Sequence, residues 1–201
     1  FLGVVLSGGH TSFYIVDGYA SFHEIGSTRD DAAGEAFDKI GRVIGMPYPG
    51  GAAMDRLAYE GNPHAYKLPS PALAGDTLDF SFSGLKTAAL NLIHNAADRG
   101  EEVRRADLAA SFTATVADGF AKKLGMALDA TGLSTVVVAG GVSANSHLRA
   151  AADNVCKQHG ARLCLPPLNL CGDNAAMVAL QGYYEYKCGA RAASDLNASA
   201  V

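Results

Sequence analysis

The chain has 201 residues, enough for one sizeable hydrophobic core or two small ones. Apolar residues make up 49% of it and charged residues 18%, a composition that excludes an intrinsically disordered or fibrous protein. The formal net charge of −4 reveals no strongly basic face, so an RNA partner would need a local basic patch, a small contact area or another subunit.

The first 26 residues predict a β-meander. Three strands are expected, over residues 1–6, 12–16 and 19–25. The pair Asp17-Gly18 is a tight-turn signal between the second and the third. Because the chain has no initiator methionine and starts within a strand-like run, we expect it to be a fragment that lacks an N-terminal portion.

Residues 30–45 predict the first helix, because apolar residues recur there at helical spacing. Thr28 and Asp30 are candidate caps for its start, and Gly45 is a candidate for its end. The buried stripe is expected to consist of Ala33, Phe37, Ile40 and Ile44.

The rest of the chain predicts a mostly helical stretch and then two βα units. Helices are expected over 52–59, 84–99, 107–131, 145–159 and 173–187, strands over 135–139 and 162–165, and a loop over 61–83. A meander followed by βα units indicates one mixed sheet with helices on its faces. We therefore expect a core of residues 1–50 and 131–201 with a helical insertion at about 52–130.

The cysteines and the apolar runs argue against a zinc ribbon and a membrane protein. None of the four cysteines stands in a C-x-x-C pair, which predicts reduced thiols in a cytosolic protein. No apolar run approaches the roughly 18 residues of a membrane helix, and no signal peptide opens the chain. We expect a cytoplasmic protein without a membrane partner.

A glycine turn, Ser7-Gly8-Gly9-His10-Thr11, follows the first strand. Glycines permit positive φ and remove side-chain bulk, so successive amides can form an anion-binding concavity. Two glycines are also common in a plain hairpin turn. The motif alone leaves both interpretations open.

A second glycine turn, Gly140-Gly141, follows the predicted strand 135–139 and leads into a helix. Helix N-termini favour anions and hydrogen-bond acceptors, which makes this turn a candidate ligand cradle. Asn145 is either a helix cap or a ligand contact. Since ligands of α/β sheets gather at such edges, we expect both turns to border one nucleotide site.

The first helix carries charged residues in a pattern typical of a solvated face. Glu35 and Lys39, like Asp38 and Arg42, are opposite charges four residues apart. Asp38 also adjoins the predicted buried position Phe37, which makes it a candidate for the edge of a cleft.

Asp173 lies where the last helix is expected to begin, so it is either an N-cap or a metal ligand. One carboxylate cannot hold a transition metal by itself. No two of the six histidines stand three or four residues apart, so the sequence contains no H-x-x-x-H pair.

Taken in order, these motifs resemble the universal TsaD family, with the older names YgjD and glycoprotease. The stretches that carry the resemblance span nearly the whole chain. They are LSGGHT at 6–11, DDAAGEAFDK at 30–39, YPGG at 48–51, DFSFSGLKT at 79–87, AGGVSAN at 139–145 and DN at 173–174.

The resemblance implies a single incomplete domain over residues 1–201. Its fold would be α/β, an actin-like ATPase (ribonuclease H-like) lobe with a mixed sheet and a helical insertion. It also implies an acyltransferase that moves the threonylcarbamoyl group from threonylcarbamoyl-AMP to the N6 amine of a tRNA adenosine near the anticodon. The fragment alone is expected to be inactive.

The resemblance also implies which residues bind the substrate. Asp38 would hold a ribose hydroxyl, and Gly51 would let the backbone approach the adenosine with Asp55 beside it. Asn145 would contact the nucleotide from the other side of the cleft. The phosphate and acyl end would be lined by Val5, Leu6, Ser7, Gly8 and Gly9.

Cofactors and partners follow from the resemblance as well. It implies one divalent metal per subunit, with iron favoured and zinc or magnesium as alternatives, and with Asp173 as one ligand. It implies an adenine nucleotide, as threonylcarbamoyl-AMP or ATP, and as partners tRNA, the acyl-adenylate and other threonylcarbamoylation subunits. The chain departs from the family in lacking the H-x-x-x-H metal pair, which we expect upstream of Phe1.

Three alternatives compete with this reading of the chain. An actin-like kinase or ATPase would share the fold, but its phosphate loops usually carry Asp where Ser7 stands. A non-catalytic, nucleotide-binding scaffold paralogue would have no reason to keep Asp38, Asn145 and Asp173 together. A metalloprotease, which the older family name suggests, is disfavoured because the sequence has no H-E-x-x-H.

Overall fold

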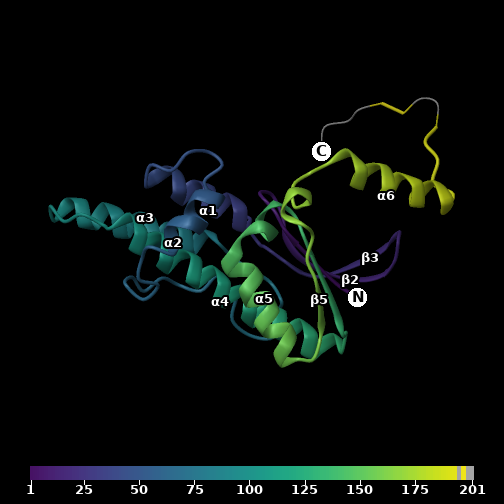
Figure 1. The fold of residues 1–201 in the computed structure, drawn as a ribbon, viewed down its shortest axis with the longest axis horizontal. Coiled ribbons are helices and arrows are strands. Elements are labelled where there is room, and N and C mark those ends of the chain that lie inside the picture. The colour runs from purple at the N-terminus through teal and green to yellow at the C-terminus, as the bar shows by residue number, and fades with distance from the viewer. Residues whose placement is uncertain (194–195, 198–201) are drawn as a thin grey trace.

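The computed structural model describes residues 1–193 and 196–197 and contains one five-stranded sheet (Figure 1). The strand order is β3-β2-β1-β4-β5. The strands are β1 (Leu2–Leu6), β2 (Thr11–Gly18), β3 (Ser21–Ser27), β4 (Thr135–Ala139) and β5 (Arg162–Cys164). The first three pair antiparallel, whereas β1–β4 and β4–β5 pair parallel, so the predicted mixed sheet is confirmed.

The hairpin between β2 and β3 turns later than the sequence predicts. Gly18 pairs with Ser21, so the two-residue loop is Tyr19-Ala20. Asp17 falls at a register shift within β2, which makes it part of a bulge. The prediction of a turn at Asp17-Gly18 was therefore wrong, because the extra residue of the bulge moves the turn along the chain.

The predicted helices are present with ends shifted by up to a few residues. They are α1 (Ala33–Val43), α2 (Gly51–Ala58), α3 (Ser83–Asp98), α4 (Arg105–Thr131), α5 (Ser146–Gln158) and α6 (Ala175–Lys187). Two short 3₁₀ turns, η1 (Gly141–Ala144) and η2 (Leu168–Leu170), follow β4 and β5. No helix among the described residues has both the length and the apolar character needed to span a bilayer.

The first backbone amides of α1 find their hydrogen-bond acceptors in the glycine turn at residues 7–11 and not in a local N-cap side chain. Thr11 Oγ1 accepts a hydrogen bond from the Ala33 amide at 2.9 Å, and the Ser7 carbonyl accepts one from the Gly34 amide at 3.2 Å. The N-cap residue is Ala32, whose side chain can accept no bond. Thr28 and Asp30 do not cap this helix, so that prediction was wrong.

Asp30 instead caps α3, more than 50 residues further along the chain. Its Oδ1 accepts hydrogen bonds from the amides of Phe82 and Ser83 at 2.7 and 3.1 Å, and its Oδ2 accepts from the hydroxyls of Ser81 and Ser83. Burial alone would raise the pKa of Asp30, but these hydrogen bonds hold it below its ordinary value. The motifs at 30–39 and 79–87 thus interlock.

The hydrophobic core is continuous and runs between the sheet and the long helix α4. Phe13 of β2 stacks on Phe120 of α4, with ring centroids 6.3 Å apart, and Phe37 of α1 meets Phe112 edge-on at 5.4 Å. The predicted stripe of α1 is confirmed, since Ala33, Phe37, Ile40 and Ile44 are all buried. Buried residues of the proposed core and of the proposed insertion share one cluster, and the division between them stays a prediction.

Helix α6 stands apart from the rest of the chain (Figure 1). The Tyr184 ring stacks on Tyr19 of the β2–β3 loop, and Gln181 Nε2 donates to the Tyr19 carbonyl at 3.1 Å. None of the α6 residues is buried. Its N-cap is Asn174, whose side chain accepts from the Met177 amide, so the prediction that Asp173 caps this helix was wrong.

Candidate functional site

A cavity of about 540 Å³ lies where the two glycine turns face helices α1 and α2. Its size is within the range of small-molecule and cofactor sites. The lining residues come from segments far apart in the sequence. They are Gly8, Gly34, Phe37, Asp38, Tyr48, Pro49, Gly51, Ala52, Asp55, Arg56, Gly141, Val142, Ala144, Asn145 and Leu168.

The first glycine turn is ordered by its own serine. Ser7 Oγ accepts hydrogen bonds from the amides of Gly9 at 3.3 Å and His10 at 2.9 Å. The concavity expected for an anion is therefore partly filled by a hydroxyl oxygen of the same turn. Gly8 lines the cavity, and open space surrounds the position where a Cβ would stand at Gly8 or Gly9. Neither glycine has the positive φ that the sequence suggested.

Gly34 is a site residue that the motif analysis did not single out. A Cβ on Gly34 would lie 2.7 Å from the Ser7 carbonyl oxygen, 2.8 Å from Gly8 Cα and 2.9 Å from Val142 Cγ2. The missing side chain lets the first turn of α1 touch both glycine turns at once. The signal that could have found it is a glycine near the predicted start of a helix, where it has no conformational advantage over alanine.

Asp38 fastens the loop before α2 to α1. Its Oδ1 accepts from the amides of Gly50 at 2.7 Å and Gly51 at 3.2 Å, and no hydrogen bond to Oδ2 is found among the described residues. The expected ion pair with Arg42 is also absent from the described residues, because the carboxylate turns toward these amides. The ion pair between Glu35 and Lys39 is confirmed at 2.6 Å.

Asn145 caps α5 and also faces the cavity, so its two alternative roles combine. Its Oδ1 accepts from the Leu148 amide at 3.0 Å. Its Nδ2 has no hydrogen-bond partner among the described residues, although the residue is only 7% exposed. Gly140 makes this geometry possible: with φ of 95°, any Cβ on it would collide with the Leu6 carbonyl oxygen at 2.3 Å.

Asp55 joins α2 to the start of α5. Its carboxylate accepts from the Ser146 amide and hydroxyl and lies 2.8 Å from His147 Nδ1. Tyr59 completes the group, since its hydroxyl is 2.9 Å from Ser146 Oγ and its ring packs on the His147 imidazole. Asp55 thus holds two walls of the cavity together.

The remaining candidate residues lie outside the cavity lining. Val5 and Leu6 are strand residues of β1, and Leu6 is buried beneath Gly140. Ser7 supports the turn through its hydroxyl, and Gly9 sits on its exposed side. The structure therefore brings Gly8, Asp38, Gly51, Asp55 and Asn145 together and leaves these others beside them.

Asp173 lies in the exposed segment before α6, not in the cavity. Among the residues that the structure describes, no group of three or more histidine, cysteine, aspartate or glutamate side chains could hold a metal ion. The described residues do not by themselves fit the divalent metal that the resemblance implies.

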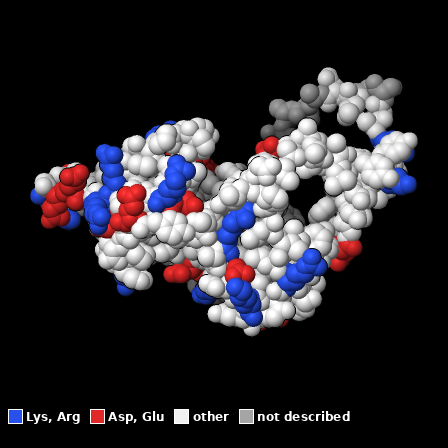
Figure 2. Space-filling model, in the orientation of Figure 1, with Lys and Arg blue, Asp and Glu red and all other residues white. Residues whose placement is uncertain are grey.

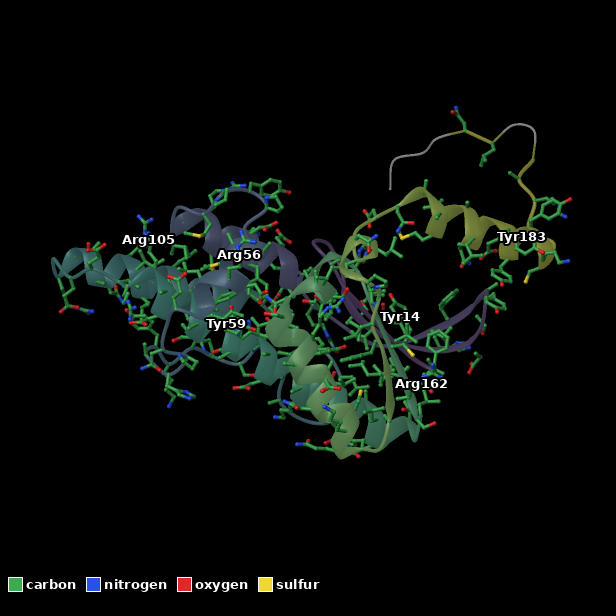
Figure 3. The ribbon with its side chains drawn as sticks, in the orientation of Figure 1. Tyr14, Arg56, Tyr59, Arg105, Arg162 and Tyr183 are labelled. Atoms are coloured by element: carbon green, nitrogen blue, oxygen red, sulfur yellow. The ribbon has the colours of Figure 1, made fainter. Side chains whose placement is uncertain are left out.

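The cavity pairs apolar walls with a few polar groups. Phe37, Val142, Leu168 and the exposed Tyr48 supply apolar surface. Arg56, next to Asp55 in the sequence, is the cation of the lining (Figure 3). This arrangement suits a flat heteroaromatic group with a polyhydroxyl and an anionic part, which is the chemistry of a nucleotide.

Comparison with known proteins agrees with this chemistry. The family model for TsaD, tRNA N6-adenosine threonylcarbamoyltransferase, matches residues 2–180. Proteins of that name from Bacillus thuringiensis (strain Al Hakam) and Clostridium botulinum (strain 657) are 49% and 46% identical to the chain. Each match covers 98% of this chain, which spans 58% of the length of these relatives.

A solved structure has a similar fold. Full-length HypF in a phosphate- and nucleotide-bound form superposes with a TM-score of 0.66 over 93% of this chain and 33% of HypF, at 15% identity. The predicted actin-like ATPase fold is confirmed by this likeness and by the mixed sheet. Because the family model matches residues 2–180, most of the chain, the chain belongs to the TsaD family.

Proposed function

We propose that the chain is the adenylate-binding part of a tRNA N6-adenosine threonylcarbamoyltransferase. The observation that carries the proposal is the meeting of Gly8, Asp38, Gly51, Asp55 and Asn145 around one cavity. They come from four different segments, since Gly51 and Asp55 both lie on α2, and each was expected to bind the nucleotide. The names of the relatives support the reaction.

In this proposal the adenosine lies against the apolar wall and its sugar faces α1. The free Oδ2 of Asp38 accepts a ribose hydroxyl, since Oδ1 is already bound to Gly50 and Gly51. Nδ2 of Asn145 donates to the nucleotide from the opposite wall. The Gly8 amide and the Arg56 guanidinium face the negative charge of the phosphate. Asp55 contributes by positioning α2 against α5.

The reaction joins the N6 amine of the tRNA adenosine to the carbamoyl carbon of threonylcarbamoyl-AMP. The bond from that carbon to the phosphate oxygen breaks, AMP leaves, and the amine loses one proton. AMP is a good leaving group, so holding the two reactants in line supplies much of the rate. A donor aimed at the developing charge typically lowers such a barrier by about 3 kcal/mol.

Other parts of the proposal reach beyond the cavity. Asp173 is proposed as one ligand of a divalent metal, iron by the resemblance, although the described residues contain no group of three or more histidine, cysteine, aspartate or glutamate side chains that could hold one. No step of the reaction is derived through that metal. The tRNA substrate supports the cytoplasmic location expected from the sequence, and other threonylcarbamoylation subunits are proposed as partners.

Calorimetry of this chain with AMP and ATP tests the nucleotide site. Binding is expected, and it should weaken about tenfold or more in an Asn145→Ser variant, which keeps a helix-capping oxygen but removes the Nδ2 donor. Binding of neither AMP nor ATP would overturn the proposal. His64→Ser, in an exposed loop away from the cavity, is the matched control.

The transfer reaction calls for a chimera. The segment of the Bacillus thuringiensis relative that matches this chain, 199 residues, is replaced by this chain, and threonylcarbamoyladenosine in tRNA is measured by mass spectrometry. Transfer by the chimera is expected. A chimera that folds and binds AMP yet modifies no tRNA would contradict the proposed function. This chain alone is expected to modify none.

A further inference from the structure

Three of the four arginines whose side chains have no partner among the described residues lie on helices α1, α2 and α4. Among the described residues, the arginines whose side chains make neither an ion pair nor a hydrogen bond are Arg42, Arg56, Arg105 and Arg162. Arg56 lines the cavity. Arg42 lies one helical turn from Asp38 on α1, and the Arg105 guanidinium packs on Gly45, the residue after the C-cap of α1. Arg162 is on the edge strand β5.

Figure 3 shows that Arg162 lies apart from Arg56 and Arg105. Arg56 and Arg105 lie on the helical part of the molecule, near α1 and α2, whereas Arg162 lies by the sheet. Figure 2 shows blue side chains on the same helical part, with red ones between them. We call Arg42, Arg56 and Arg105 the arginine surface.

Other cations nearby are neutralised, which sets the arginine surface apart. Lys39 pairs with Asp31 and Glu35, and Arg104 pairs with Asp107 at 3.2 Å. Exposed guanidinium groups left without counter-charges repel one another modestly at the surface, and a polyanion would relieve that repulsion. In a chain whose net charge is −4, this local concentration of free positive charge points to an anionic ligand.

The arginine surface extends beyond the cavity lining, which indicates that the anionic ligand is larger than a mononucleotide. Arg56 faces the cavity, but Arg42 and Arg105 are outside its lining, so one mononucleotide in the cavity cannot satisfy all of them. A phosphodiester backbone can, because its charges recur along the chain. Tyr48 is 78% exposed at the cavity edge and offers a ring on which an unpaired base can stack.

We propose that the arginine surface binds the phosphate backbone of the substrate RNA and leads the target base past Tyr48 toward the cavity. This inference rests on the proposed function and adds the surface that receives the RNA. An acidic protein would also neutralise the arginines, so the test includes poly-glutamate as a competitor. The exposed Tyr48 ring at the cavity edge favours RNA, whose unpaired bases stack on aromatic side chains.

The test is the salt dependence of tRNA binding by this chain. Fluorescence anisotropy with a labelled tRNA transcript compares the parent with an Arg42→Gln/Arg56→Gln/Arg105→Gln variant between 50 and 200 mM salt. The variant should bind at least about tenfold more weakly at low salt, and the slope of log K against log salt should fall by about 2 to 3, near 0.7–0.9 for each lost phosphate contact. Arg162→Gln is the matched control and should change neither quantity.

Several results would overturn the inference. They are no tRNA binding at 50 mM salt, equal binding and slope in the triple variant, or competition by poly-glutamate as effective as by unlabelled tRNA. Calorimetry with AMP on Arg42→Gln/Arg105→Gln separates the two proposals. Unchanged AMP binding together with weakened tRNA binding in this double variant supports the arginine surface. If the parent chain binds no AMP, the proposed function itself is wrong. Thermal unfolding of each variant confirms that it is folded.

Discussion

The Oδ1 atom of Asp38 lies 2.7 Å from the backbone nitrogen of Gly50, which ties the middle of α1 to the loop that opens α2. The same carboxylate also accepts from the Gly51 amide at 3.2 Å. One side chain therefore has a structural half, Oδ1, and a half available to a ligand, Oδ2. The two halves can be separated by substitution.

Asp38→Asn should weaken AMP binding with little change in stability. The amide keeps an acceptor for Gly50 and Gly51 but puts a donor where a ribose hydroxyl would be bound, so we expect about a tenfold loss of affinity. Asp38→Ala removes both halves and should also destabilise the chain by about 1–3 kcal/mol, because two amides lose their acceptor. Calorimetry with AMP and urea unfolding measure the two effects. Equal AMP affinity in the parent and Asp38→Asn would show that Oδ2 does not contact the nucleotide.

Gly34→Ala should force α1 away from the glycine turns. The new methyl would lie 2.7 Å from the Ser7 carbonyl oxygen and 2.9 Å from Val142 Cγ2, distances that require a backbone shift. We expect destabilisation of about 1–3 kcal/mol, typical of overpacking, and weaker AMP binding. Gly84→Ala in α3 is the control, since nothing lies within 4 Å of its Cβ position, and it should be neutral or slightly stabilising. Similar unfolding curves for both variants would refute the close-contact argument.

The elements that periodicity predicts are those buried on one side. The stripe of α1 and the β-branched run of β4 were found as expected, because their apolar spacing directly records contact with the core. Caps were less predictable. Asp30 stands beside the start of α1 in the sequence but serves α3, because the amides that it satisfies are brought to it by the fold.

Site residues could be predicted from the sequence where the motif itself contains the functional groups. They could not be predicted where a contact arises only when the chain folds. The glycine turns, Asp38 and Asn145 could be chosen from sequence and meet in the cavity. The use of Ser7 Oγ as the acceptor inside its own turn could not be foreseen, since two glycines permit several turn geometries. Leu168 joins the lining from a 3₁₀ turn that has no sequence periodicity.

Asp31 should make the free energy of unfolding depend on pH in the acid range. Its carboxylate binds Lys86 and also Lys39, and the hydrogen bond with Lys86 is the main reason why the pKa of Asp31 lies below its ordinary value of 3.8. A lowered pKa in the folded state means that the unfolded chain binds the proton more readily. The stabilisation is therefore complete above about pH 4 and is lost as the pH falls through the folded-state pKa.

Urea unfolding of the parent and Asp31→Asn from pH 7 to pH 3 tests this dependence. At pH 7 the variant should be less stable by about 1–3 kcal/mol, because Lys86 and Lys39 lose a charged acceptor, and the difference should shrink below pH 4. Asp153→Asn is the control, since the surface pair of Asp153 and Lys157 should contribute less than about 1 kcal/mol. A difference that stays constant down to pH 3 would contradict the assignment.

Helix α6 should make this chain associate with itself. Val178 and Leu180 are 65% and 57% exposed, and Tyr183 and Tyr186, on the same helix, are more than half exposed. Apolar groups gathered on one exposed element favour association. Val178→Glu/Leu180→Glu should therefore shift sedimentation velocity toward the monomer at high concentration. Ala175→Glu/Ala176→Glu adds the same charge at smaller exposed side chains and should leave the distribution closer to that of the parent. If both double variants behave alike, repulsion and not the loss of apolar surface is responsible.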